Sequence, residues 1–257
     1  MICADGIKNN LNCRDIKVKV YDIIDSTNTE AKRYAADTCD FSPVLFVAKE
    51  QSGGRGRLGR QFLSRAACGI YMSLLYFTED SLSDAISITT SAAVTVAESI
   101  ERITGKKMRI KWVNDIYNEK GKVCGILTEA LDVKGRRAIV VGIGINVGDV
   151  DFPEELRGIA STIGDVGNNA ELLVASITDG LLLSAENPAD KTYMSAYRQR
   201  LMMVGDTVDL FRGGELMGHG TVFGVDDEGG LLFRPHGKDD VEVIRSGEIS
   251  VRMNNKR

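Results

Sequence analysis

The sequence predicts an α+β protein, with a largely antiparallel sheet flanked by helices and followed by a small β-barrel. Runs that alternate polar and apolar residues are interspersed with segments of helical periodicity. Very short turns separate three apolar runs between residues 108 and 147, which favours antiparallel hairpins over parallel crossovers. After residue 201, short β-runs follow one another closely between glycine pairs and acidic turns, as in a small barrel.

The first elements are strands around one helix. Residues 16–24 alternate polar and apolar side chains and predict a strand. Thr27 and Glu30 have the spacing of a capping box, so we expect a helix to begin there. Residues 44–49 and 69–77 are apolar enough for two buried strands, and the loop between them is rich in glycine and arginine.

A long helix and a run of hairpins are predicted next. Residues 83–104 carry apolar side chains at helical spacing, and Gly105 follows as a C-terminal stop. From 108 to 147 the pattern is strand, turn, strand, turn, strand, with turns at 119–121 and 134–135.

The last part of the chain divides near residue 200. Residues 148–168 are rich in Gly and Asp and predict a loop, whereas 170–185 and 189–201 predict helices. We therefore expect a catalytic domain over 1–200 and a barrel domain over 201–257. The β-runs assigned to the barrel are Thr207–Phe211, Gly220–Val225, Leu231–Arg234, Val241–Ile244 and Ile249–Val251.

Composition limits the class of protein. The 257 residues carry a net charge of −4, which disfavours a general binder of nucleic acid or membrane surface. No stretch approaches the roughly 20 apolar residues of a membrane span, and the N-terminus lacks the apolar core of a signal peptide. The five cysteines form no C-x-x-C pair, and the two histidines both lie near the C-terminus. We expect a reduced, cytoplasmic protein without a zinc site.

The loop from Gln51 to Arg60 concentrates positive charge. Between Lys49 and Arg65 there are five basic residues and one acidic residue. Glycines let a backbone approach a ligand closely, and arginines match carboxylate and phosphate oxygens. The glycine spacing also matches a dinucleotide fingerprint, but that motif must open a helix, and a strand follows here. The alternative is a solvated surface loop, and we favour an anion site.

Two further segments carry candidate chemistry. Residues 111–117 hold the only tryptophan together with a lysine, an amide and a carboxylate, although an Asn-Asp pair alone is most often a turn. The hairpin partner brings Lys122, and two lysines facing one anion can neutralise a carboxylate beside a triphosphate. Residues 142–147 alternate Gly and Ile, which leaves one strand face bare either for a ligand or for tight sheet packing.

The order of these motifs is more specific than any one of them. From Tyr21 to Val147 the chain reads S-T-N, Q-x-x-G-R-G-R-x-G-R, K-W-x-N-D, K-x-x-G-I-L-x-E and G-I-G-I-N-V. This order resembles the catalytic domain of biotin–protein ligases. The resemblance implies a class II synthetase-like mixed sheet followed by an SH3-like barrel. It also implies that ATP and biotin are joined to biotinyl-5′-AMP, with Mg²⁺, and that biotin then passes to a lysine of a biotin carboxyl carrier domain.

The resemblance assigns roles to residues of this chain. Biotin binding falls to Ser26, Thr27, Asn28, Gln51, Arg55, Gly56, Arg57, Lys122 and Gly125. Catalysis falls to Arg57, Lys122 and Lys111, and nucleotide binding to Arg57, Arg60, Phe62, Asn114 and Asn146. Asp115 is a candidate for positioning or for Mg²⁺. The chain departs from the family pattern at Val113, where proline is usual, at Phe62, where tryptophan is frequent, and at Cys124, which is small enough to fit.

Three rival functions have distinct signatures. A lipoate–protein ligase shares the fold but lacks this arginine-rich loop, and a non-enzymatic nucleotide-binding regulator needs no pair of lysines. A DNA-binding repressor is disfavoured by the charge and by the roughly fifteen residues before the first predicted strand, too few for a three-helix DNA-binding domain. We therefore expect the monofunctional type. Whether the chain forms a homodimer stays open.

Overall fold

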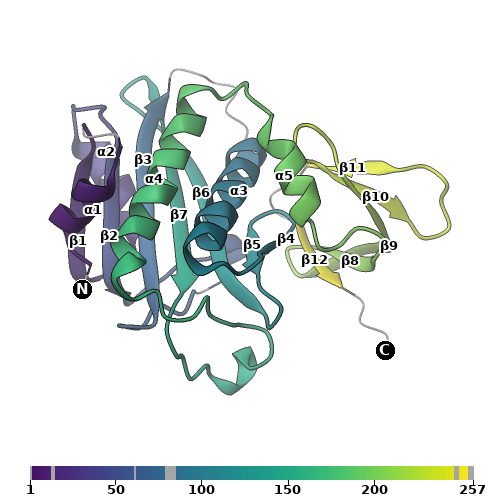
Figure 1. The fold of residues 1–257 in the computed structure, drawn as a ribbon. Coiled ribbons are helices and arrows are strands. Elements are labelled where there is room, and N and C mark those ends of the chain that lie inside the picture. The colour runs from purple at the N-terminus through teal and green to yellow at the C-terminus, as the bar shows by residue number, and fades with distance from the viewer. Residues whose placement is uncertain (1, 13–14, 61, 79–84, 246–248, 254–257) are drawn as a thin grey trace.

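The computed structural model describes residues 2–12, 15–60, 62–78, 85–245 and 249–253, and shows two sheets (Figure 1). The first sheet has seven strands in the order β1-β2-β3-β7-β6-β5-β4. Only β1 and β2 run parallel, so the sheet is mixed and largely antiparallel, as predicted. Its strands are β1 Lys17–Ile24, β2 Val44–Gln51, β3 Gly69–Thr78, β4 Arg109–Lys111, β5 Asp115–Tyr117, β6 Lys122–Val133 and β7 Arg136–Asn146.

Helices cover both faces of this sheet. They are α1 Ala4–Asn10, α2 Thr27–Asp37, α3 Ala85–Thr104, α4 Ala170–Glu186 and α5 Tyr193–Arg200. Figure 1 shows α3 and α4 side by side across one face. Leu45 and Val47 point into the large core beneath those helices, whereas Val44 and Phe46 pack against α2 on the other face. Alternate side chains of β2 therefore pack into two different cores, one on each face of the sheet. Both sets must be apolar, which explains the uninterrupted apolar run.

Two local predictions are wrong in detail. Helix α2 begins one residue earlier than a capping box on Thr27 requires: Ser26 is the N-cap, and its Oγ accepts from the Thr29 backbone N–H at 3.5 Å. Thr27 does not cap the helix, because its hydroxyl faces Gln51 and Ser73 on the sheet. The first hairpin strand is also split, since Trp112–Asn114 form a turn between β4 and β5. The Trp112–Val113 peptide bond in that turn is cis.

The N-terminal helix α1 was not predicted. Ile7 and Leu11 are buried, and the Cys3 backbone N–H donates to the Glu171 carboxylate of α4 at 2.8 Å. Seven residues are too few to show a clear helical period, so the amino-acid pattern predicts this helix only weakly. None of the described helices is long and apolar enough to cross a membrane.

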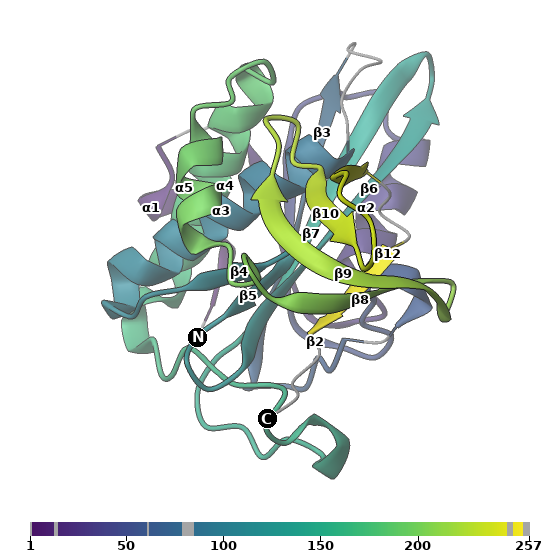
Figure 2. The ribbon, with the colours of Figure 1, turned by 90° about the vertical axis from the view of Figure 1, so that its right-hand side faces the viewer.

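The second sheet follows α5 and is antiparallel, with order β11-β10-β9-β8-β12. Its strands are β8 Thr207–Arg212, β9 Glu215–Val225, β10 Leu231–Pro235, β11 Glu242–Ile244 and β12 Ile249–Met253. Figure 2 shows the long, curved β9 passing in front of the larger sheet. The two sheets are joined where the Trp112 indole N–H donates to the Gly229 carbonyl at 2.9 Å. The turn between β9 and β10 is thus fixed to the β4–β5 turn.

Candidate active site

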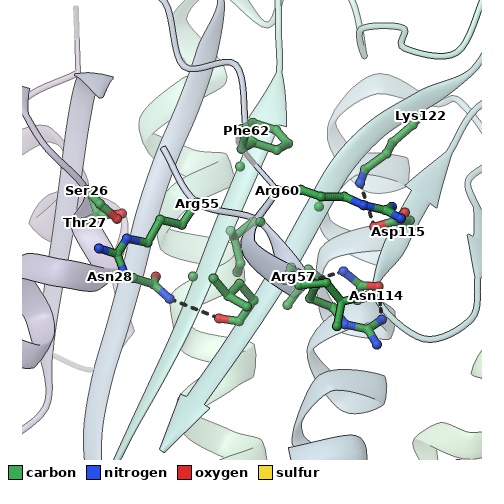
Figure 3. Close-up of a pocket in the computed structure, with 18 of the residues that line it drawn as sticks. Ser26, Thr27, Asn28, Arg55, Arg57, Arg60, Phe62, Asn114, Asp115 and Lys122 are labelled. Carbon is green, nitrogen blue, oxygen red and sulfur yellow. Dashed lines mark hydrogen bonds and ion pairs between the residues drawn. The ribbon is translucent and has the colours of Figure 1, made fainter. Parts of the chain in front are cut away.

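One pocket gathers nearly all the predicted site residues, as Figure 3 shows. It is formed by the start of α2, the loop between β2 and β3, the β4–β5 turn and the middle strands β6 and β7. Its lining residues are Ser26, Thr27, Asn28, Gln51, Arg55, Gly56, Arg57, Leu58, Arg60, Phe62, Lys111, Trp112, Asn114, Asp115, Lys122, Gly125, Ile126, Leu127, Gly142, Ile143, Gly144 and Val251. Of the predicted residues, only Asn146 is absent from this lining.

The start of α2 brings uncharged polar side chains into the pocket. Thr27 is buried, and both its backbone N–H and its hydroxyl face the Gln51 side-chain oxygen, at 2.8 and 3.1 Å. The Gln51 amide donates on to Ser64 Oγ at 2.9 Å, so its orientation is fixed. Buried hydroxyl and amide groups at this end can donate to and accept from a neutral polar ring.

The alternating glycines of β7 make room for side chains. A Cβ built at Gly142 would lie 1.9 Å from Asn28 Oδ1, and one at Gly144 would lie 2.5 Å from the Phe62 ring. A side chain at either position would therefore displace the group that lies there. Gly125 is paired with Gly144 across β6 and β7, and the Phe62 ring lies over both. The bare strand face therefore receives one amide and one aromatic ring.

The opposite end of the pocket is cationic. Arg57 donates to Asn114 Oδ1 at 2.7 Å, and the Asn114 amide donates to the Ile126 carbonyl at 2.8 Å. Lys122 Nζ lies 2.7 Å from Asp115 Oδ1. Five of the described lining residues are basic and only Asp115 is acidic, in a chain whose net charge is −4. This end is built to receive an anion.

Burial distinguishes Arg57 from its neighbours. Desolvation lowers the pKa of Arg57, and the nearby Asp115 carboxylate offsets part of that effect. Arg55 and Arg60 are exposed. In Figure 3 Arg55 extends toward Asn28, whereas Arg57 and Arg60 extend toward Asn114 and Asp115. The arginines of one loop thus serve both ends of the pocket.

The arginine loop is a hairpin rather than the start of an α-helix. The Gly56 N–H donates to the Arg60 carbonyl at 2.7 Å, and the Phe62 N–H donates to the Gly54 carbonyl at 3.0 Å. Gly59, at the tip, has a φ of 71°, which favours glycine. A dinucleotide fingerprint requires a helix N-terminus at this point, which the loop does not provide.

Asn146 lies behind the pocket. Its amide donates to the Ser161 carbonyl at 3.0 Å, and the Ser161 N–H in turn donates to the Lys122 carbonyl at 2.8 Å. The Lys122 N–H donates to the Ile159 carbonyl at 2.8 Å. Asn146 therefore holds the segment that fixes the backbone of Lys122. Its assignment to nucleotide binding stays a prediction.

Comparisons with known proteins agree with this geometry. Residues 20–146 match the Biotin/lipoate A/B protein ligase family. The bifunctional ligase/repressor BirA of Bacillus spizizenii is 32% identical over 240 residues, which cover 90% of this chain and 72% of that protein. The chain belongs to the biotin/lipoate A/B protein ligase family. The resemblance inferred from the order of motifs is thereby confirmed.

Other members of the family align over more of their own length. The biotin–[acetyl-CoA-carboxylase] ligase of Paracoccus denitrificans is 29% identical over 88% of this chain and 96% of that protein. Among solved structures, the biotin protein ligase from Aquifex aeolicus in complex with biotin and ATP is 28% identical, with a TM-score of 0.75, over 92% of this chain and 99% of that one. The predicted fold class is confirmed by this match.

A magnesium site in this family member rests on Asp115 alone. Among the described residues, no group of three or more His, Cys, Asp or Glu side chains could hold a metal ion. Protein sites for Mg²⁺ commonly use one or two carboxylates together with substrate phosphates. A single carboxylate in a cationic pocket fits that pattern, so the residues present suit Mg²⁺ that would arrive with a nucleotide.

Trp112 should report ligand binding. It is the only tryptophan, it is 4% exposed and it lines the pocket beside Lys111. We expect its emission to change when biotin and ATP are added, because a bound anion alters the field and the water around the indole. A Trp112→Phe variant removes the signal and serves as the control. A flat titration under conditions where calorimetry detects binding would contradict the assignment.

Proposed function

We propose that this protein is a biotin protein ligase. The carrying observation is that one pocket joins a polar end, with the uncharged side chains of Thr27 and Gln51, to a cationic end, with Arg57 and Lys122. The ureido ring of biotin has one carbonyl oxygen and two N–H groups, which suit the polar end. The biotin carboxylate and the ATP triphosphate suit the cationic end.

The first step is adenylation. A biotin carboxylate oxygen attacks the α-phosphorus of ATP, the bond to the β-phosphate oxygen breaks, and pyrophosphate leaves. Lys122 and Arg57 both line the cationic end of the pocket, and we assign to them the stabilisation of the charge that builds up on phosphorus. Asp115 would hold Mg²⁺, which would supply further neutralisation of the triphosphate. Phe62 offers a ring for the adenine, and Lys111 adds positive charge.

The second step passes biotin to a protein. A lysine amine of a biotin carboxyl carrier domain attacks the mixed anhydride carbonyl, and AMP leaves as its bond to the acyl carbon breaks. We assign the chemistry to a catalytic domain over residues 1–200 and place a barrel domain over 201–257. We place the enzyme in the cytoplasm, without DNA or membrane partners; the four cysteines in the described part of the chain are free.

The rival acyl group is lipoate. Its dithiolane ring has no N–H and no carbonyl, so it cannot form hydrogen bonds with the hydroxyl and amide groups near Thr27. Each hydrogen bond that biotin forms there contributes about 0.5–1.5 kcal/mol. The polar end therefore favours biotin. A non-enzymatic regulator would not need Lys122 directed at the place where phosphate binds.

Adenylate formation tests the proposal. The protein is incubated with ATP, Mg²⁺ and either biotin or lipoate, and the products are separated by mass spectrometry. We expect biotinyl-5′-AMP with biotin, and no acyl-adenylate with lipoate or without ATP. Lipoyl-5′-AMP in preference to biotinyl-5′-AMP would favour the lipoate ligase, and no adenylate with either acid would favour a regulator.

A further inference from the structure

An ion pair outside the pocket is hydrogen-bonded to Asn28, one of the residues assigned to biotin binding. Lys32 Nζ lies 2.7 Å from Glu129 Oε1, and the Asn28 amide donates to Glu129 Oε2 at 2.8 Å. The Lys32 and Glu129 side chains are only 26% and 27% exposed. Neither residue lines the pocket, yet their carboxylate holds the amide of a residue that does.

The carboxylate decides which way the Asn28 amide points. Asn28 Nδ2 faces Glu129 Oε2 and, at 3.3 Å, the Leu127 carbonyl, and both of these groups only accept hydrogen bonds. Burial raises the pKa of Glu129, but the hydrogen bonds from Lys32 and Asn28 and the charge of Arg55 outweigh it, so that the pKa lies below its ordinary value. Glu129 is therefore ionised at neutral pH. Asn28 Oδ1 must then point the other way, toward Ser73.

The hydrogens beyond Asn28 can be counted. Ser73 Oγ lies 2.6 Å from Asn28 Oδ1 and 2.7 Å from Thr27 Oγ1, and Thr27 Oγ1 lies 3.1 Å from Gln51 Oε1. These three contacts share two hydroxyl hydrogens, because neither amide oxygen carries one. One of the three contacts is left without a hydrogen, and Gln51 Oε1 also accepts from the Thr27 backbone N–H at 2.8 Å. All three would be satisfied if the Asn28 amide were turned around and its Nδ2 donated to Ser73.

We propose that Glu129, held by Lys32, is a positioning residue for the Asn28 amide. It keeps the amide in the orientation in which the hydrogen-bonded series from Asn28 through Ser73 and Thr27 to Gln51 has one hydrogen fewer than it has contacts. The pocket then favours a ligand that donates a hydrogen bond to this series of side chains. This inference rests on the proposed function, in which the ureido N–H of biotin is that donor. Without the carboxylate, the Asn28 amide turns around and donates to Ser73, so that all three contacts of the series have a hydrogen. A ligand then gains less binding free energy by donating to the series.

The test variant is Glu129→Gln, which keeps the shape but can donate to a turned Asn28 Oδ1. We expect the KM for biotin to rise roughly ten- to a hundredfold, the range expected for one hydrogen bond to a charged group. We expect kcat and the KM for ATP to stay near wild type. Lys32→Met keeps the carboxylate but removes one of the hydrogen bonds that favour its ionised form, so its KM for biotin should rise less, staying within about fivefold of wild type.

A readout that does not depend on catalysis is the side-chain amide of Asn28 in nitrogen-15 NMR spectra. Its two hydrogens should shift strongly in Glu129→Gln and little in Lys32→Met, with or without biotin. An unchanged amide and an unchanged KM for biotin in Glu129→Gln would overturn the inference. A fall in kcat together with an equal rise in the KM for ATP would also overturn it, because a merely structural role predicts that result. If wild type formed no biotinyl-5′-AMP but the amide shifted as described, the proposed function would fail and the positioning role would stand.

Discussion

Replacing Lys122 with alanine is expected to slow formation of biotinyl-5′-AMP by roughly 10²–10³-fold. Lys122 Nζ lies in the cationic end of the pocket, 2.7 Å from Asp115 Oδ1. Negative charge builds up around the α-phosphorus as the biotin carboxylate attacks, and a fixed ammonium group there stabilises the transition state more than the substrates. The measurement is the single-turnover rate of adenylate formation at saturating biotin and ATP.

Folding should be little affected by this change. The backbone bonds of Lys122 to Ile159 and Ser161 involve no side chain, so the alanine variant keeps them. Lys120→Ala is the matched control: it removes the same charge from the exposed tip of the same hairpin. Its adenylation rate should match wild type. Near-normal adenylation by Lys122→Ala would move the catalytic role to Lys111.

The sheet was predictable where local signals and the fold agree. The turn at Lys134 and Gly135 has positive φ at both residues, 51° and 80°, the conformation of a tight hairpin turn, and the sequence marked it through its glycine. The cap of α2 was misplaced by one residue because Ser26 and Thr27 are both good caps, and only the contact of Thr27 with Ser73 decides between them. Such a contact crosses 46 residues, so no local pattern reveals it.

The site shows the same division between local and distant information. The motifs supplied most of the side chains that line the pocket, because each motif contributes residues to its lining. Glu129 stands in the quoted K-x-x-G-I-L-x-E motif but received no role, and Ser73 was not singled out. Both act across strands, through Asn28, so their importance depends on spatial pairing. The contact between Trp112 and Gly229 joins segments 117 residues apart and was equally hidden.

Replacing Arg57 with glycine is expected to release biotinyl-5′-AMP before transfer. Arg57 is the loop arginine fixed at the cationic end through Asn114, and the adenylate is an anion that binds there. Loss of charge-assisted hydrogen bonding costs about 1.5–3 kcal/mol, or roughly ten- to a hundredfold in retention. The free anhydride then acylates any exposed lysine amine. The measurement is biotin transfer to serum albumin, at matched rates of adenylate production.

The matched control for Arg57 lies in the same segment. Arg65→Gly removes the same charge from an exposed residue that does not line the pocket, so albumin labelling should stay at the wild-type level. Arg57→Gly should raise albumin labelling and lower the advantage of the carrier domain over albumin, because the reaction then occurs in solution and no longer on the enzyme surface. If Arg57 only stabilised the fold, the variant would form less adenylate, and the ratio of carrier labelling to albumin labelling would not change. Equal background labelling by wild type and Arg57→Gly would leave Arg57 without a part in holding the intermediate.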